Sequence, residues 1–181
     1  MKTKSIFSLI ITSLLLAFAC TKPTQEIAVT AHTTQPGQSA VKDDESKKNI
    51  VQTAIASPDH KTLVAALKAA EYVDALSNAG PFTVFAPTDE AFAKLPEGTV
   101  EKLTRPENKS TLQDILEYHV YVGVIRESMV QGNLNLNQVN GKNVFLTKKD
   151  GKLQVNEANI IATVETSNGI IYVTDKVLLP Q

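Results

Sequence analysis

The spacing of apolar residues changes near the middle of the chain. Between residues 49 and 119, apolar side chains recur three or four positions apart, which predicts amphipathic helices. Beyond Val120 they recur at every second position, and Asn-Gly and Asp-Gly pairs separate the runs, which predicts strands joined by hairpins. The predicted helices cover residues 50–55, 62–76, 88–95 and 111–119. This segregation predicts an α+β fold of helices and antiparallel strands, with one early strand at residues 82–85 recruited into the later sheet.

Residues 82–96, FTVFAPTDEAFAKLP, combine a short apolar strand, a proline, a helix and a second proline. Thr88 is the predicted N-cap of this helix, because its hydroxyl can accept a bond from a backbone N–H. Asp89 places negative charge in the first turn, where the helix dipole favours it. Phe85 and Phe92 are expected to hold strand and helix together in the core. Every polar residue of the segment thus has a structural explanation.

Two further helix starts carry capping residues. Thr62 is the predicted N-cap of the second helix, and Ser110 with Gln113 forms a predicted capping box for the helix that ends at His119. His119 falls on the apolar face of that helix. We therefore expect a buried imidazole that joins helix to sheet, with its nitrogens hydrogen-bonded.

The N-terminus has the layout of an export signal. Lysines precede an apolar run over residues 6–18, which is too short to cross a bilayer comfortably. Cys20, the only cysteine of the chain, follows this run after a small residue, which resembles a bacterial lipoprotein signal. We expect residues 1–19 to be removed and Cys20 to carry a lipid anchor. The alternative is ordinary cleavage after Ala19, which would leave a secreted protein.

A tether is expected between this signal and the domain. Residues 20–48 are rich in Thr, Gln, Pro, Ser and charged side chains and show no sustained apolar period, so we expect them to be flexible. Residues 49–181 carry the periodic patterns and are long enough for one domain. Thr21, rather than an acidic residue, follows Cys20, which resembles the outer-membrane sorting signal of some bacteria.

Composition and motifs exclude several classes of function. The 181 residues carry a formal charge of −1 without a dense basic block, so no nucleic-acid partner is expected. The domain has only His60 and His119 and no cysteine, which excludes a Cys/His zinc site. No H-E-x-x-H, G-x-S-x-G, Walker A or G-x-G-x-x-G motif occurs. Asp89 and Asp175 are explained by capping and turn bonding. We expect no enzyme, no metal and no cofactor.

Four segments together resemble the fasciclin domain family. They are residues 82–96, the sequence ILEYHV at residues 115–120, Val139-Asn140-Gly141, and the closing IYVTDKVLLP at residues 171–180. Their order and spacing match the two end segments and the tyrosine-histidine motif of that family. The resemblance covers residues 49–181, which is one whole domain.

The resemblance implies a wedge of two antiparallel β-sheets with helices packed along one edge. It also implies a role in adhesion or extracellular protein interaction. Tyr118 and His119 match the tyrosine-histidine motif that the family uses in adhesion-receptor recognition, so they are the candidate partner-binding residues. The alternative for His119 is the buried role in the core. The residues with an expected structural role are Phe85, Thr88, Asp89, Phe92 and Asp175.

Three functions stay open at this point. The first is a lipid-tethered module that binds a protein or glycan at the cell surface and supports adhesion. The second is a carrier of an apolar small molecule, such as a lipid or pigment, in a crevice between helices and sheet. The third is a purely structural envelope protein. We expect an exported monomer anchored to the outer membrane, facing either the periplasm or the exterior, or else a secreted one.

Overall fold

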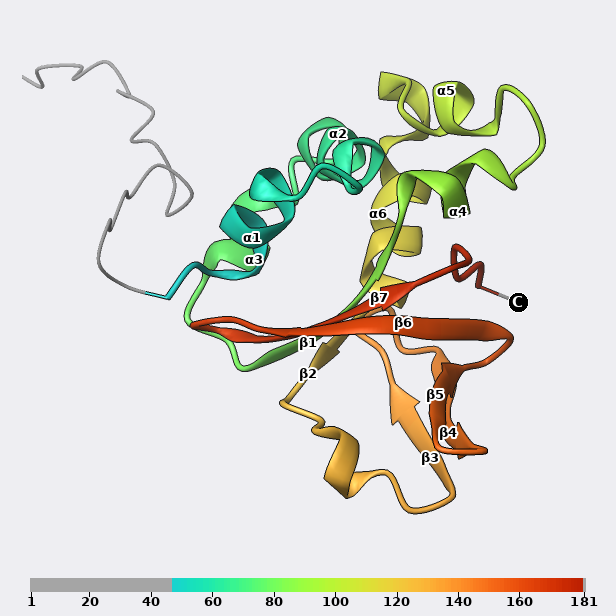
Figure 1. Ribbon diagram of the computed structural model, residues 1–181. Coiled ribbons are helices and arrows are strands. Elements are labelled where there is room, and N and C mark those ends of the chain that lie inside the picture. Colours follow the sequence, from blue (N-terminus) through green and yellow to red (C-terminus); the bar gives the residue numbers. More distant parts are fainter. Residues whose placement is uncertain (1–46, 181) are drawn as a thin grey trace, which may run out of the picture. The chain divides into compact units, whose positions relative to one another are not determined.

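The computed structural model describes residues 47–180, whose helices and strands are drawn in Figure 1. The predicted signal peptide (residues 1–19), the lipidation site Cys20 and the tether up to residue 46 lie outside the described residues and stay predictions. Within residues 47–180, no helix is both long enough and apolar enough to cross a membrane.

Helices fill the first half of the domain, as the apolar spacing predicts, but the single helix expected over residues 62–76 is two helices with a break at Glu71, which has a positive φ. The helices are α1 (Ile50–Ala56), α2 (Lys61–Ala69), α3 (Val73–Ser77), α4 (Asp89–Ala93), α5 (Thr99–Leu103) and α6 (Lys109–Tyr118), with short 3-10 turns η2 (Pro106–Asn108) and η3 (Glu127–Met129). Asn49 and Gln52 form a capping box at the start of α1. The helix ends before Pro58, because the residue that precedes a proline disfavours helical angles.

Two of the predicted caps are wrong. α2 begins at Lys61, so Thr62 lies inside the helix, and its N–H is satisfied by a side chain from another element. α6 begins at Lys109 without a side-chain cap, so Ser110 also lies inside the helix. Gln113 does not reach back to cap that helix, because its Nε2 donates to the Ala70 carbonyl oxygen at 2.8 Å. The start of α2 depends on a tertiary contact that local spacing does not contain, whereas α6 continues directly from the 3-10 turn η2.

The strands form one mixed sheet, so the prediction of two antiparallel sheets is wrong. The strands are β1 (Phe82–Pro87), β2 (Val120–Val122), β3 (Asn133–Asn137), β4 (Asn143–Lys149), β5 (Lys152–Val155), β6 (Ala158–Glu165) and β7 (Gly169–Thr174). Their order is β2-β1-β7-β6-β5-β4-β3. The early strand β1 does join the later strands, but its pairing with β7 is parallel. All other neighbours are antiparallel.

Strand β6 is the point at which the single sheet bends. Its first residues, Ala158 and Asn159, pair with β5, whereas its remainder pairs with β7. The register shifts between Ile160 and Ala162, and such a bulge bends a strand and increases its twist. β5, β4 and β3 therefore turn away from β7 while the ladder stays continuous.

The hairpins follow the turn signals in part. Asp150 and Gly151 connect the paired residues Lys149 and Lys152, and both have the positive φ that a tight hairpin turn requires. Asn140-Gly141 lies instead in the longer loop 138–142, because its Asn140 amide bonds to Asp114 of α6 at 3.2 Å. This tertiary contact draws the loop toward the helix.

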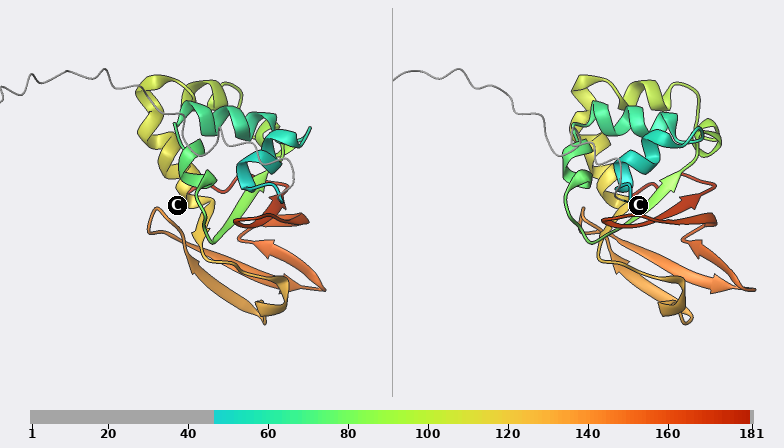
Figure 2. Two further views of the ribbon diagram at one scale, coloured as in Figure 1. Left: turned by 90° about the vertical axis from the view of Figure 1, so that its left-hand side faces the viewer. Right: turned by 60° about the vertical axis from the view of Figure 1, so that its left-hand side comes forward.

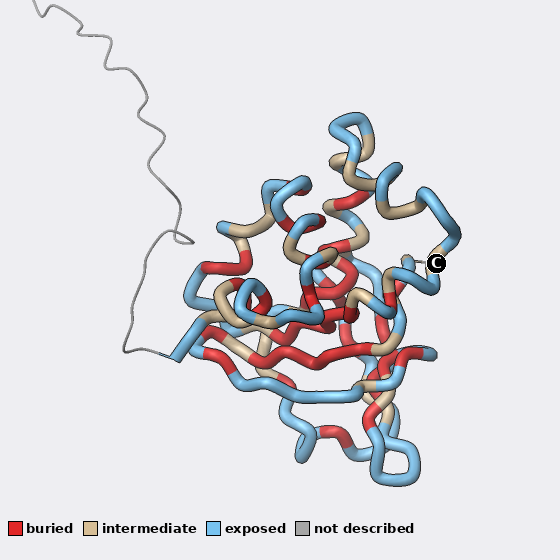
Figure 3. The backbone as a smooth tube through the Cα atoms, turned by 45° about the horizontal axis from the view of Figure 1, so that its top comes forward, coloured by how far each residue is buried: buried red, intermediate tan, exposed pale blue. Residues whose placement is uncertain are grey.

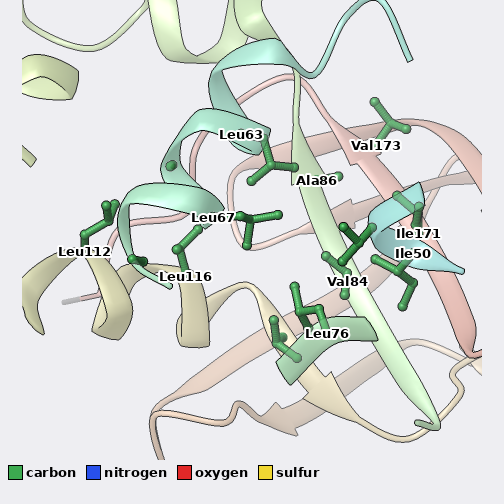
Figure 4. Close-up of a cluster of buried hydrophobic side chains, with 14 residues drawn as sticks. Ile50, Leu63, Leu67, Leu76, Val84, Ala86, Leu112, Leu116, Ile171 and Val173 are labelled. Carbon is green, nitrogen blue, oxygen red and sulfur yellow. The ribbon is translucent and has the colours of Figure 1, made fainter. Parts of the chain in front are cut away.

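β1 and β7 lie between two hydrophobic clusters. Figure 2 shows the helices on one side of these strands and β3, β4 and β5 on the other. Figure 4 shows the cluster on the helix side, where Val84, Ala86, Ile171 and Val173 meet apolar residues of α1, α2, α3 and α6. Phe85 and Tyr172 point the opposite way, into the second cluster. The helices thus cover a face of β1 and β7. The resemblance implies instead that they pack along one edge.

Candidate functional site at the end of helix α6

His119 is a buried link between α6 and the C-terminal segment. It follows the last residue of the helix and is only 4% exposed. Its Nδ1 lies 2.8 Å from the Ile115 carbonyl oxygen, and its Nε2 accepts the N–H of Leu178 at 3.0 Å. The expectation of a buried, hydrogen-bonded imidazole is confirmed. The ring joins the helix to the residues after β7.

The bonding pattern fixes the protonation of His119. Because Leu178 N–H donates to Nε2, that nitrogen carries no proton, and Nδ1–H donates to the Ile115 oxygen. Burial lowers the pKa of His119 from 6.5 to about 4, although the bond to Ile115 opposes this shift. His119 is therefore neutral at pH 7.

Tyr118 points to the opposite side of the α6 terminus. Its ring is 4% exposed and packs in the second cluster, below β1 and β7. The hydroxyl donates to the Asn143 carbonyl oxygen at 3.0 Å and accepts the Asn156 side-chain amide at 3.3 Å. Tyr118 thus connects α6 to strand β4 and to the turn after β5. The two motif residues lie on different sides, and the fold covers both.

An apolar crevice adjoins His119 on the helix side. Side chains from α2, α4, α5, α6 and the C-terminal segment line it, and they include Leu63, Phe92, Leu103, Ile115 and Leu179. The empty space at its centre measures about 20 Å³, which is room for one water molecule. Its lining is suited to an apolar ligand, but the helices must separate before one of any size can enter.

Asp89 caps a neighbouring helix. Thr88 Oγ1 accepts the Ala91 N–H at 3.2 Å, which confirms the predicted N-cap of α4. The Asp89 carboxylate instead reaches α2, where it accepts the N–H groups of Thr62 at 2.7 Å and Lys61 at 3.3 Å. Burial alone would raise the pKa of Asp89, but these donors outweigh it and hold the pKa below its ordinary value.

Asp175 performs a similar role at the sheet. Its two carboxylate oxygens accept the backbone N–H of Asn159 at 2.8 Å and the Asn159 side-chain amide at 2.7 Å. Burial opposes ionisation, yet these bonds and the nearby lysines Lys94 and Lys176 lower the pKa of Asp175. The carboxylate ties the end of β7 to the start of β6, which is a longer-range contact than the turn bonding expected for it.

Phe85 and Phe92 lie on opposite sides of β1 and do not hold strand and helix together as a pair. Phe85 is fully buried, and its ring stacks on Tyr172 with a centroid separation of 6.0 Å. Phe92 is half-buried, borders the helix-side cluster and lines the apolar crevice. The alternation of β1 accounts for this, since Val84 and Ala86 face the helices and Phe85 faces away.

Asn168 is a buried hub that sequence reasoning missed. Its Oδ1 accepts the Ile50 N–H at 2.9 Å, and its Nδ2 donates to the carbonyl oxygens of Leu76 at 2.8 Å and Asn78 at 2.7 Å. It thereby joins the β6–β7 turn to α1 and to the end of α3. The Asn-Gly pair predicts the turn but not these contacts. Gly169 is required beside it, because a Cβ atom there would collide with the Phe82 carbonyl.

The polar side chains that the motifs single out act as braces within the domain. The carboxylates of Asp89 and Asp175 and the imidazole of His119 bond to groups of the domain itself. Among residues 47–180, no group of three His, Cys, Asp or Glu side chains is placed to hold a metal ion. Direct contact of Tyr118 or His119 with a partner stays a prediction, and it requires the α6 terminus to open.

Comparison with known proteins places this geometry in a family. The family model described as the fasciclin domain matches residues 58–180. The chain is 46% identical over 167 residues to Protein sll1483 of Synechocystis sp., with 92% of each chain covered. It is 38% identical over 109 residues to the cell surface glycolipoprotein MPB83 of Mycobacterium bovis, covering 60% of this chain and 47% of that protein.

A solved structure shares the fold. The FAS1 domain pair of the insect cell adhesion molecule fasciclin I superposes with a TM-score of 0.67 at 20% identity, covering 74% of this chain and 51% of that one. The family match over residues 58–180 and the 46% identity to Protein sll1483 establish that the chain belongs to the fasciclin domain family.

Proposed function

We propose that this protein is a lipid-anchored interaction module of the bacterial cell envelope, which binds a protein or glycan partner and supports adhesion. The anchor is a lipid on Cys20 after removal of residues 1–19, and residues 20–48 hold the domain away from the membrane. An outer-membrane location follows from this proposal, with the domain in the periplasm or at the surface. Without the lipid, the same module would be secreted.

One observation carries the proposal. The polar side chains that the motifs single out are used inside the domain, as Asp89 caps α2, Asp175 holds β6, and His119 holds the C-terminal segment. A domain braced in this way presents a rigid surface and keeps its ionisable groups occupied. Rigid surfaces suit recognition, because little conformational entropy is lost on binding.

The names of related proteins agree with an envelope location. One relative is a cell surface glycolipoprotein, and the solved structure with the same fold comes from a cell adhesion molecule. Those names describe those proteins. For this chain they support the reading of Cys20 as a lipidation site and of the domain as a module that binds at a surface.

The anchor and the adhesion role are tested separately. Mass spectrometry of the mature N-terminus is expected to find a diacylglyceryl group on Cys20, and the C20S variant is expected to leave the membrane fraction. A strain that lacks the chain should attach to its surface less well, and the wild-type chain should restore attachment. An unmodified Cys20 would refute the anchor, whereas unchanged attachment would favour a purely structural envelope role.

Tyr118 and His119 enter this function as supports beneath the surface. Their bonds hold the α6 terminus against Asn143 and Leu178. We expect His119→Ala to lower thermal stability before it lowers binding. If the His119→Ala variant kept full thermal stability but lost adhesion, His119 would instead contact the partner directly.

The apolar crevice favours one alternative, a carrier of an apolar small molecule. Its lining is almost entirely apolar, and α4 and α5, which cover it, are short helices of five residues each. Native mass spectrometry of the protein from its own host would reveal a co-purifying lipid or pigment. A clean mass of the unliganded protein would exclude this alternative.

A further inference from the structure

Within residues 47–180, one edge of strand β6 is unpaired along most of its length. Although β6 lies within the sheet order, β5 pairs with it only at Ala158 and Asn159. From Ile160 to Glu165 it pairs with β7 on one side, and no strand within residues 47–180 pairs with its other side. All residues from Ile161 to Glu165 are exposed, whereas the neighbouring strand β7 is almost wholly buried. Figure 3 shows the burial of each residue along the backbone.

The register identifies the free backbone groups on this edge. Thr166 N–H donates to the Gly169 carbonyl oxygen, so this pair is a hydrogen-bonded one. In an antiparallel ladder such pairs alternate with non-bonded ones. Thr163 and Glu165 are therefore the residues that direct their N–H and C=O groups away from β7. These are the groups that an added strand would need.

The side chains of this edge favour pairing. Ile161 is 58% exposed and Val164 is 37% exposed, and no charged residue occurs between Ala158 and Val164. Proteins usually protect open edges with charges, prolines or short strands. The outermost strand β2 does so here, since it has only three residues, and the other outermost strand, β3, alternates polar asparagine with leucine. Apart from Glu165 at its end, whose carboxylate lies 3.5 Å from Lys47 Nζ, the edge of β6 carries only the bulge near Ile161 as protection.

We propose that the free edge of β6 pairs with the same edge of a second copy of this chain, antiparallel about a two-fold axis at Thr163. The register that joins the outward backbone groups places Thr163 opposite Thr163 of the second copy. It also places Val164 opposite Ala162, and Glu165 opposite Ile161. Cross-strand threonine and β-branched pairs stabilise sheets, and no like charges face each other.

A second copy is the occupant that this edge fits, because a strand that is uncharged from Ala158 to Val164 supplies both halves of an isologous contact. The contact spans few residues and is smaller than the roughly 1,200 Å² that a stable dimer needs. Pairing is therefore weak in dilute solution and becomes stronger at high local concentration. This changes the expectation of a monomer. It does not depend on the lipid anchor, although an anchor would concentrate the copies.

Cross-linking tests the geometry in the full chain. Cα atoms of a hydrogen-bonded pair lie about 5.5 Å apart, so cysteines at position 163 are within reach of a short bismaleimide. Cells that express T163C should yield a cross-linked dimer. The exposed turn variant D150C should not, and wild type, with Cys20 alone, sets the background. A T163C yield equal to that of D150C would overturn the proposal. The same low yield would result if residues before Lys47 of the same chain covered the edge, and the proposal would then be wrong as well.

Sedimentation tests the energetics. The full chain in mild detergent should show a dimer fraction that rises with concentration. T163K would place two lysines opposite each other and should weaken dimerisation up to about fivefold. N135K, an exposed lysine substitution on β3, is the matched control and should dimerise like wild type. A wild-type chain that stays monomeric at the highest concentration, or equal behaviour of T163K and N135K, would refute β6 pairing. Failure of the anchor leaves these measurements unchanged.

Discussion

Burial of His119 should make the stability of the domain depend on pH between 6.5 and 4. The imidazole is neutral in the folded state, because Nε2 must stay unprotonated to accept the Leu178 N–H. Its pKa is lowered from 6.5 to about 4 by burial. In the unfolded chain the ring is hydrated and protonates near its ordinary pKa. As the pH falls, protons therefore bind the unfolded state first and stabilise it relative to the folded state.

The magnitude follows from the two pKa values. A folded pKa below the unfolded one contributes stability that is complete above pH 6.5 and is lost as the pH falls toward 4. A change from 6.5 to about 4 corresponds to about 3 kcal/mol of unfolding free energy in total. Between pH 7.5 and pH 4.5 the expected loss is about 2.5 kcal/mol. Burial also lowers the pKa of His60, which adds a contribution of the same sign.

Urea unfolding followed by far-UV circular dichroism at pH 7.5, 5.5 and 4.5 measures this loss. The H119Q variant is the matched comparison, because its side-chain oxygen can still accept the Leu178 N–H but does not titrate. It should be less stable than wild type at pH 7.5 and lose less stability on acidification. The carboxylates of Asp89 and Asp175, whose pKa values are lowered, contribute mainly below this range. If H119Q lost as much stability as wild type, the buried neutral imidazole would be refuted as the cause.

Four further substitutions test the packing and the braces by urea unfolding at pH 7.5. Phe85→Ala should cost about 3–5 kcal/mol because the ring is fully buried, whereas Phe92→Ala should cost no more than about 2 because its ring is half-buried. Equal losses would show that the two rings are misassigned. Asp89→Ala should cost about 1 kcal/mol through the lost cap on α2, and an unchanged midpoint would argue against that cap. Asn168→Ala should cost about 3 kcal/mol because it leaves several buried backbone groups unpaired, and a loss below 1 would contradict its role as hub.

Local sequence patterns predict the parts of this fold whose causes are local. The Thr88 cap bonds only three residues away, and the end of α1 before Pro58 depends on the next residue. The Asp150-Gly151 turn needs only the positive φ of its own residues. In each case, the residues that determine the local geometry lie within a few positions of one another along the chain.

Contacts between distant segments could not be predicted in this way. Asp89 fits its own helix dipole as well as it fits the α2 terminus, and only the packing of α2 against α4 selects the second role. The single sheet likewise depends on β6 changing partners at its bulge. Alternating apolar residues predict that strands exist and which face is buried, but not which strand lies beside which.

The braces explain why motif residues identify this family without revealing a ligand. Asp89, Asp175, His119 and Asn168 each lie at or next to the end of an element and bond backbone groups of a segment distant in sequence. A substitution at any of them loosens the connection between elements, whatever partner the surface binds. Their constraint is therefore independent of any ligand, and under the proposed function recognition depends on residues that carry little of the fold. The exposed edge of β6 meets that condition, because its outward backbone groups pair with no strand within residues 47–180.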